Sequence, residues 1–378
     1  MSDSPFGNFG FFNDIVKMIG QQGPDAWRQT ARQLALSIVA QSGHDANPDP
    51  ALRQRAEVLA PLVTSRLGLL LGVAAPLPPD IVSRVELAAR ALDDWEPLIA
   101  PSLNLGTPLD LTSSSSDTFA PMLAEIAKTM GPLFMGFQLG SAAGHFALSA
   151  WSRAVLPLPR QRDGATLCVD NVSDFAQSNE IDLDHVLAFA VAREVAGEVF
   201  LRRDGLSMAL EALLLDAVND ARATQGNIMD RLTGMLSQGN AEDLMGDPSR
   251  MLEGLGAFDE TPATQALDRA IAVIAAAIDV VAEQVTREMV GPIDALREAW
   301  LASMNREDSN ESSAAALFGV SRDADTVQRA RTFVESATLL EGADGLRGLF
   351  QADGLPSDLE LDDATAWQER VANSPFAS

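Results

Sequence analysis

Several long stretches of this chain place apolar residues three and four positions apart, the spacing of one face of an α-helix. The clearest are residues 23–41, 50–72, 79–103 and 264–290, the third with a helix start at Pro78, Pro79 and Asp80. One segment, residues 165–172 (ATLCVDNV), has the pattern of a strand. The sequence therefore predicts a mainly α-helical protein with a small β element near residues 165–172.

Polar stretches rich in serine, glycine or proline interrupt the helical pattern. They lie at residues 111–121 (LTSSSSDTFAP), 239–249 (GNAEDLMGDPS) and 304–315 (MNREDSNESSAA). We expect a flexible aromatic and glycine-rich segment, a helical part, a core, and a C-terminal helical part packed on that core. Their predicted bounds are residues 1–19, 20–110, 121–303 and 316–378.

Charge and cysteine content exclude several classes of function. The chain has 27 Lys and Arg against 53 Asp and Glu, a formal net charge of −26. Such a surface repels phosphate groups, so we expect no nucleic-acid or anionic-membrane partner. Cys168 is the only cysteine, which excludes a disulfide framework and a thiolate cluster, and its apolar neighbours predict a buried, inert thiol. The N-terminus has no secretory signal pattern, so the expected location is cytoplasmic.

Residues 129–152 contain no fixed charge and are long enough to cross a bilayer of about 30 Å. Gly136, Gly140 and Gly144 form a ridge that permits close helix packing, either inside the chain or in a homo-oligomer. Polar residues along the segment and the lack of flanking basic clusters favour a buried central helix over a membrane span. We expect His145 to be a hydrogen-bonded core histidine.

The order of several segments along the chain resembles that of a known family. The chain reads GPLFMGFQLGSAAGH, then LPLPR, the strand, DLDHVLAFAVAREVAGEVFL, ALREAW and LFGVSRDADTVQRARTFVESA. This order resembles the zincin-like zinc-dependent metalloproteases of high-GC Gram-positive bacteria, also described as hydrolases associated with deazaflavin coenzyme biosynthesis. The resemblance covers about Gly20 to Val371. It implies a zincin-like core and, on the helix after the strand, a His-Glu-x-x-His zinc motif, whose positions here read REVAG from Arg193 to Gly197.

The motif is degenerate at both histidine positions. Two imidazoles four residues apart share a helix face, and a catalytic zinc needs three protein ligands and an open water position. Arg193 stays protonated and repels a dication, and Gly197 has no side chain. Glu194 matches the implied general base but lacks a metal-bound water to act on. Asp279 and Glu283 are the carboxylates of the downstream helix, and neither is assigned as a third ligand. We expect no zinc and no other cofactor.

A different metal is the alternative. Glu194 and Glu198 are four residues apart, as are Asp279 and Glu283, and Asp216 and Asp220 repeat the spacing. Converging carboxylates would suit magnesium or calcium. Nearby arginines at 193, 202, 203 and 222 favour solvated ion pairs instead. If Arg193 is buried, it needs a carboxylate partner, and Glu194, Asp279 and Glu283 are the candidates.

The sequence favours a catalytically inactive zincin-like protein that acts as a protein-binding, scaffold or regulatory pseudo-enzyme. A residual metal-dependent hydrolase or peptidase with a non-zinc, carboxylate-ligated metal is the alternative. The expected partner is another protein, and a homo-oligomer stays open. The N-terminal segment is too sparse in apolar residues to fold alone. Its candidate partner-binding residues, which dock on the chain's own core or on another protein, are Phe6, Phe9, Phe11 and Phe12.

Overall fold

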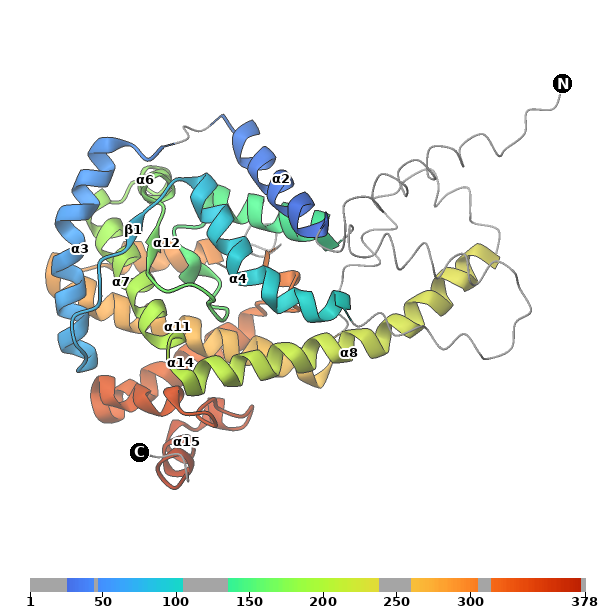
Figure 1. The fold of residues 1–378 in the computed structure, drawn as a ribbon. Helices are drawn as coiled ribbons and strands as arrows, with labels where there is room; N and C mark the ends of the chain where they lie inside the picture. Colours follow the sequence, from blue (N-terminus) through green and yellow to red (C-terminus); the bar gives the residue numbers. More distant parts are fainter. Residues whose placement is uncertain (1–25, 44–46, 105–134, 238–259, 305–313, 375–378) are drawn as a thin grey trace.

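A computed structural model describes residues 26–43, 47–104, 135–237, 260–304 and 314–374 (Figure 1). They form a mainly α-helical fold, as predicted. A helix without a label in Figure 1 covers residues 135–149. The labelled α-helices are α2 (Ala26–Gln41), α3 (Pro50–Leu71), α4 (Arg84–Asn104), α6 (Val169–Ser178), α7 (Leu183–Leu201), α8 (Asp204–Ser237), α11 (Pro262–Val290), α12 (Asp294–Met304), α14 (Ala324–Glu341) and α15 (Ala364–Ala372). Short 3₁₀ helices are η1 (Arg153–Val155), η2 (Gly342–Phe350) and η3 (Glu360–Asp362).

The predicted β element is present but short. Strand β2 (Thr166–Leu167) pairs in parallel with β1 (Asp80–Ile81), so that Asp80 lies opposite Thr166. The strand does not continue to residue 172, because α6 begins at Val169 and buries Val172 and Ala176 at helical spacing. The apolar run was too short for its period to separate a strand from the first turn of a helix.

The helix start predicted at Pro78, Pro79 and Asp80 is wrong. Asp80 pairs with the second strand, and α4 begins only at Arg84. Ser83 and Glu86 form the actual start: Glu86 Oε2 accepts from Ser83 N (2.9 Å), and Ser83 Oγ accepts from Glu86 N (3.2 Å). These residues form a capping box, whose Ser-x-x-Glu pattern is SRVE at residues 83–86.

Helix α7 lies in the middle of the fold, between α3 and α11 (Figure 1). Residues 186–198 of this helix are all buried. Apart from Arg193, Glu194 and Glu198 these residues are apolar on every side of the helix, and such a helix is stable only when neighbours cover each side. Here α3, α6 and α11 pack against it. The REVAG positions therefore lie in the interior of the molecule.

The glycine ridge packs inside the chain. A Cβ atom added to Gly136 would lie 2.5 Å from the carbonyl oxygen of Trp27, and one added to Gly140 would lie 2.5 Å from that of Ala31. Helix α2 therefore covers this ridge. The prediction of a core histidine at position 145 is wrong, because His145 is exposed. Among the residues that the structure describes, no helix is long and apolar enough to cross a membrane.

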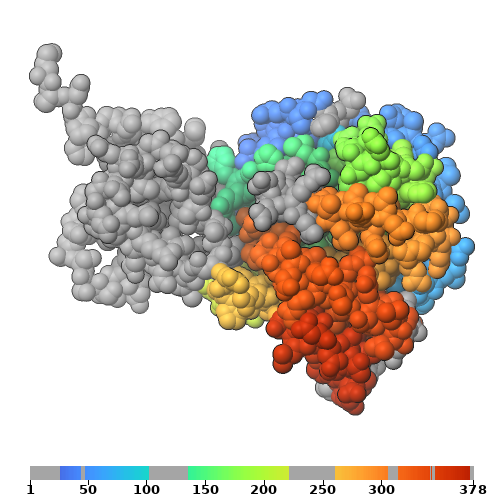
Figure 2. Space-filling model, turned by 180° about the vertical axis from the view of Figure 1, so that it is seen from behind, coloured from blue at the N-terminus to red at the C-terminus, as the bar shows by residue number. Residues whose placement is uncertain are grey.

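The C-terminal residues pack on α11 through α14. Figure 2 shows them in red against the orange atoms of α11 and α12. Trp367 anchors this part, because its ring packs edge-on to Phe333 and its Nε1 donates to the carbonyl oxygen of Gly354 (2.7 Å). One continuous apolar core runs from Trp27 to Val371. Residues 1–19, with the four predicted partner-binding phenylalanines, lie outside the described residues.

Candidate functional site

Glu194, at the implied general-base position, is completely buried, with 0% of its surface exposed. Its Oε1 accepts from Thr166 N (2.7 Å) and Arg160 Nη1 (3.0 Å). Its Oε2 accepts from Ala154 N (2.9 Å) and Arg160 Nη2 (3.0 Å). A carboxylate offers about four lone-pair sites, and these four donors use them. Glu194 is therefore a structural anchor with no acceptor capacity for a water proton.

Glu198, one turn further along α7, shares the same arginine. Its Oε2 accepts from Arg160 Nη1 (2.8 Å) and its Oε1 from Gly164 N (2.8 Å). Burial alone would lower the pKa of the Arg160 guanidinium, but the Glu194 and Glu198 carboxylates raise this pKa above its ordinary value. A permanently charged guanidinium thus bridges both acids.

The segment between residues 150 and 167 brings these donors to α7. It leaves the preceding helix, makes the η1 turn, and then extends because Pro157 and Pro159 cannot continue a helix. Leu156 and Leu158 are buried in the core, which fixes the segment. As a result, Arg160 reaches the two carboxylates of α7.

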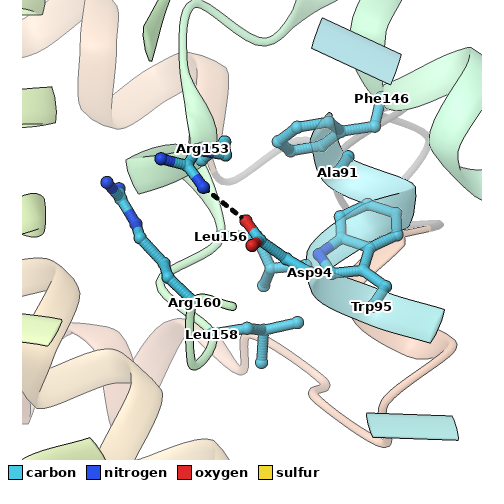
Figure 3. Close-up of a pocket in the computed structure, with 8 residues that line it drawn as sticks. All are labelled: Ala91, Asp94, Trp95, Phe146, Arg153, Leu156, Leu158 and Arg160. Carbon is cyan, nitrogen blue, oxygen red and sulfur yellow. Dashed lines mark hydrogen bonds and ion pairs between the residues drawn. The ribbon is translucent and has the colours of Figure 1, made fainter. Parts of the chain in front are cut away.

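A second arginine of this segment pairs with α4. Arg153 Nη1 donates to Asp94 Oδ2 (2.8 Å), and both side chains are buried (Figure 3). Asp94 Oδ1 accepts from Gln161 N (2.9 Å). The cavity beside them, which Arg160 also lines, has a volume of about 10 Å³. That is near the minimum for one water molecule and far below the several hundred Å³ of a ligand pocket.

Arg193 takes the first histidine position and points into the core, with 1% of its surface exposed. Its Nε donates to Asp279 Oδ1 (2.5 Å), while Asp279 Oδ2 accepts from Trp300 Nε1 (3.1 Å). The guanidinium carbon lies 4.1 Å from the centre of the Trp300 ring, a cation–π contact. Of the three carboxylate partners predicted for a buried Arg193, the structure identifies Asp279.

Gly197 takes the second histidine position, and no space is left beside it. An added Cβ would lie 2.8 Å from Ala154 Cβ, 3.2 Å from Arg160 Nη2 and 3.5 Å from Ile278 Cδ1. A methyl group already requires a neighbour to move, and an imidazole is far larger. Position 197 is therefore closed by the segment that carries Arg160.

The remaining candidate ligands are also paired or distant. Glu283 is buried and binds Arg331, with Arg331 Nη2 to Glu283 Oε2 at 2.8 Å. Burial lowers the pKa of Arg331, but the hydrogen bond and charge of Glu283 raise it above its ordinary value. Asp216 is exposed on α8, and Asp220 lies one turn after it. In the part of the chain that the structure describes, no group of three or more His, Cys, Asp or Glu side chains converges as metal ligands do.

These residues do not fit a zinc ion. At the two motif positions, Arg193 is a cation and Gly197 has only a hydrogen atom. The carboxylates Glu194, Asp279 and Glu283 are each paired with a guanidinium. Zinc would have to displace an arginine before it could bind any of them. A hard cation at Glu194, Glu198, Asp279 or Glu283 would likewise have to displace an arginine.

Sequence reasoning missed the residues that make this arrangement. Solvated pairs with arginines close in sequence were expected, yet Glu194 is buried and its partner, Arg160, lies 34 positions away. Arg202 does approach Glu198, at 3.8 Å, but its side chain is 55% exposed. The signals for the missed residues were the segments LPLPR, which ends in Arg160, and ALREAW, which ends in Trp300.

Comparisons with known proteins add a family and a fold. The sequence profile of the zincin-like metallopeptidase family matches residues 25–368. A crystal structure described as "a putative hydrolase with a novel fold", from Chloroflexus aurantiacus, superposes with a TM-score of 0.55. The superposition covers 92% of this chain and 98% of that chain at 14% identity, so the likeness shows the fold alone. The search of curated proteins gave no match.

Proposed function

This chain belongs to the zincin-like metallopeptidase family, and we propose that it is a catalytically inactive member that acts by binding another protein. The observation that carries the proposal is the state of Glu194. The carboxylate at the general-base position is completely buried and accepts four hydrogen bonds from the protein itself.

Peptide hydrolysis by a zincin requires a metal-bound water and a base with a free lone pair within reach of that water. Arg193 and Gly197 cannot ligate zinc, and Glu194 has no free lone pair. The nearby cavity of about 10 Å³ is too small for a peptide bond and its flanking residues. The scaffold does not depend on a metal, because the buried ion pairs and the continuous core hold it together.

Binding of a protein is the role that such a scaffold can still perform. The net charge of −26 favours a partner that presents Lys and Arg, and it disfavours nucleic acid. Phe6, Phe9, Phe11 and Phe12 are the residues that we propose for contact with this partner, since aromatic residues are enriched at interfaces.

The test is purification of the full chain from its own cell without chelator, in parallel with a variant that lacks residues 1–19. We expect less than stoichiometric metal by elemental analysis, and a melting temperature that neither zinc nor a chelator changes. We also expect a co-purifying protein that the truncated variant retains poorly although it is folded. Retention of this protein by the truncated variant would contradict the proposed role of the four phenylalanines.

Peptidase assays complete the test. The full chain and Glu194→Gln should show equal, background hydrolysis of a peptide library. Stoichiometric zinc, or hydrolysis that disappears in Glu194→Gln, would overturn the proposal. Stoichiometric magnesium or calcium together with hydrolysis would instead support a hydrolase with a carboxylate-ligated metal.

A further inference from the structure

We propose that the Arg160 guanidinium takes the place of a metal cation in this fold, and that Gly197 is the residue that makes room for it. This inference rests on the proposed loss of zinc binding. It adds that the two features are coupled: Arg160 can occupy its position only because residue 197 is a glycine and not a histidine.

The charge balance supports the assignment of Arg160 as the resident cation. Glu194 and Glu198 are two carboxylates in the interior, and such groups need a compensating cation. Arg160 Nη1 lies 3.0 Å from Glu194 and 2.8 Å from Glu198, and Arg153 contributes a second, more distant positive charge, 3.9 Å from Glu198. A planar guanidinium with several donors can bind two carboxylates at once, as a metal ion can, and it is never neutral at physiological pH.

The geometry supports the claim that Gly197 makes room for Arg160. Arg160 contacts α7 at positions 194, 197 and 198, which lie on one face of the helix because they are three and four residues apart. The guanidinium Nη2 lies 3.2 Å from the position that a Cβ at residue 197 would take. An imidazole at position 197 is larger than a methyl group, so it would compete with this guanidinium for the same space. Arg160 and a histidine at 197 therefore exclude one another.

Position 193, one turn before position 197 on α7, also faces α11. Arg193 Nε lies 2.5 Å from Asp279 Oδ1, and Ile278, the neighbour of Asp279, lies 3.5 Å from the added Cβ of Gly197. Positions 193 and 197 are four residues apart on α7 and both contact α11, so imidazoles at these two positions would lie on one face of α7, toward α11. The obstacle is Arg160, together with Ala154, whose Cβ lies 2.8 Å from the same added atom.

The role of Arg160 as the resident cation is tested by stability. Arg160→Met leaves two buried carboxylates without their partner, so the melting temperature should fall by on the order of 5–10 °C. Adding Glu194→Gln to this variant should recover part of the loss. The matched control is Arg202→Met, whose side chain is 55% exposed and which should change the melting temperature little. An Arg160→Met variant as stable as the control would overturn the inference.

The coupling between Arg160 and Gly197 is tested with cobalt(II), which reports tetrahedral ligation by its visible absorption. Two variants are compared, each checked for helical content by circular dichroism. The first carries Ala154→Gly, Arg193→His and Gly197→His; the second carries Arg160→Ala as well. We expect the cobalt spectrum and stoichiometric binding only in the second variant. Equal binding by the first variant would overturn the coupling, whereas zinc in the unaltered protein would overturn the proposed function.

Discussion

At the scale of single residues, the chain uses arginine for almost all of its positive charge. Lys17 and Lys128 are its two lysines. A buried guanidinium keeps its proton at every accessible pH, and its fork matches a carboxylate with two parallel hydrogen bonds. The neighbouring carboxylates raise the pKa of Arg160 and of Arg331 above its ordinary value, so a change of pH toward alkali does not release Glu194 or Glu283 from these arginines.

That positions 193 and 197 offer no zinc ligand follows from the sequence alone, because neither a guanidinium nor a hydrogen atom can ligate zinc. The partner of Arg193 could not be predicted, since three carboxylates satisfied the same chemical requirement. In the structure Glu194 and Glu283 bind other arginines, and Asp279 also accepts from Trp300. Arg160 could not be predicted because the segment that delivers it has no periodic pattern. Its position depends on the buried Leu156 and Leu158.

Cys168 gives a prediction about alkaline pH. Burial raises the pKa of its thiol from 9.0 to about 11, the effect expected for an inert core cysteine. As pH rises above 9, the unfolded chain releases this proton while the folded chain keeps it, so the free energy of unfolding decreases until pH exceeds 11. The upper limit of this decrease is roughly 3 kcal/mol.

Urea unfolding of the protein and of Cys168→Ala at several pH values measures this effect. The chain has no tyrosine and few lysines, so little else titrates in this range. We expect a steeper alkaline loss of stability in the unaltered protein than in Cys168→Ala. Parallel pH profiles would mean that the thiol titrates normally.

At the scale of elements, the ends of helices were predictable where the sequence contains their caps. Helix α3 begins after Asp49, whose side chain accepts from Ala51 N and Leu52 N, and it ends at Gly72 with φ of 63°. Helix α4 was misplaced because a proline pair followed by Asp80 imitates a helix start. Whether Asp80 begins a helix or pairs with a strand depends on Thr166, which is 86 residues away. Local patterns contain no information about such a pairing.

Gly140→Ala tests the packing of helix 135–149 on α2. Alanine favours a helix over glycine by about 1 kcal/mol, but the new Cβ would lie 2.5 Å from the Ala31 carbonyl oxygen. Neither backbone can yield without separating the helices, so overpacking should dominate. We expect a net loss of roughly 1–2 kcal/mol in urea unfolding. His145→Ala, on an exposed position of the same helix, should change stability by less than about 0.5 kcal/mol. A stabilised Gly140→Ala would show that the two helices separate easily.

At the scale of the whole molecule, ion-paired charges lie in the interior and excess acidic charge lies outside it. The described interior contains ion pairs between distant parts of the chain, such as Arg193 with Asp279 and Arg331 with Glu283. The chain as a whole has a net charge of −26, far more than the few buried acids account for, so most of this excess lies outside the described interior. Interior pairs are screened weakly by salt, whereas repulsion between exposed acids is screened strongly.

Salt should therefore stabilise the protein. Between about 10 mM and 1 M sodium chloride the Debye length falls from about 30 Å to about 3 Å, which removes most of the repulsion among surface acids. We expect the melting temperature to rise by several degrees over this range, and Arg160→Met to show a similar rise from its lower starting value, because its deficit is in the interior. A melting temperature that falls with salt would mean that exposed pairs, such as Arg55 with Asp184 and Arg329 with Asp362, outweigh the net charge. A rise confined to Arg160→Met would place the dominant repulsion at the buried carboxylates instead of the surface.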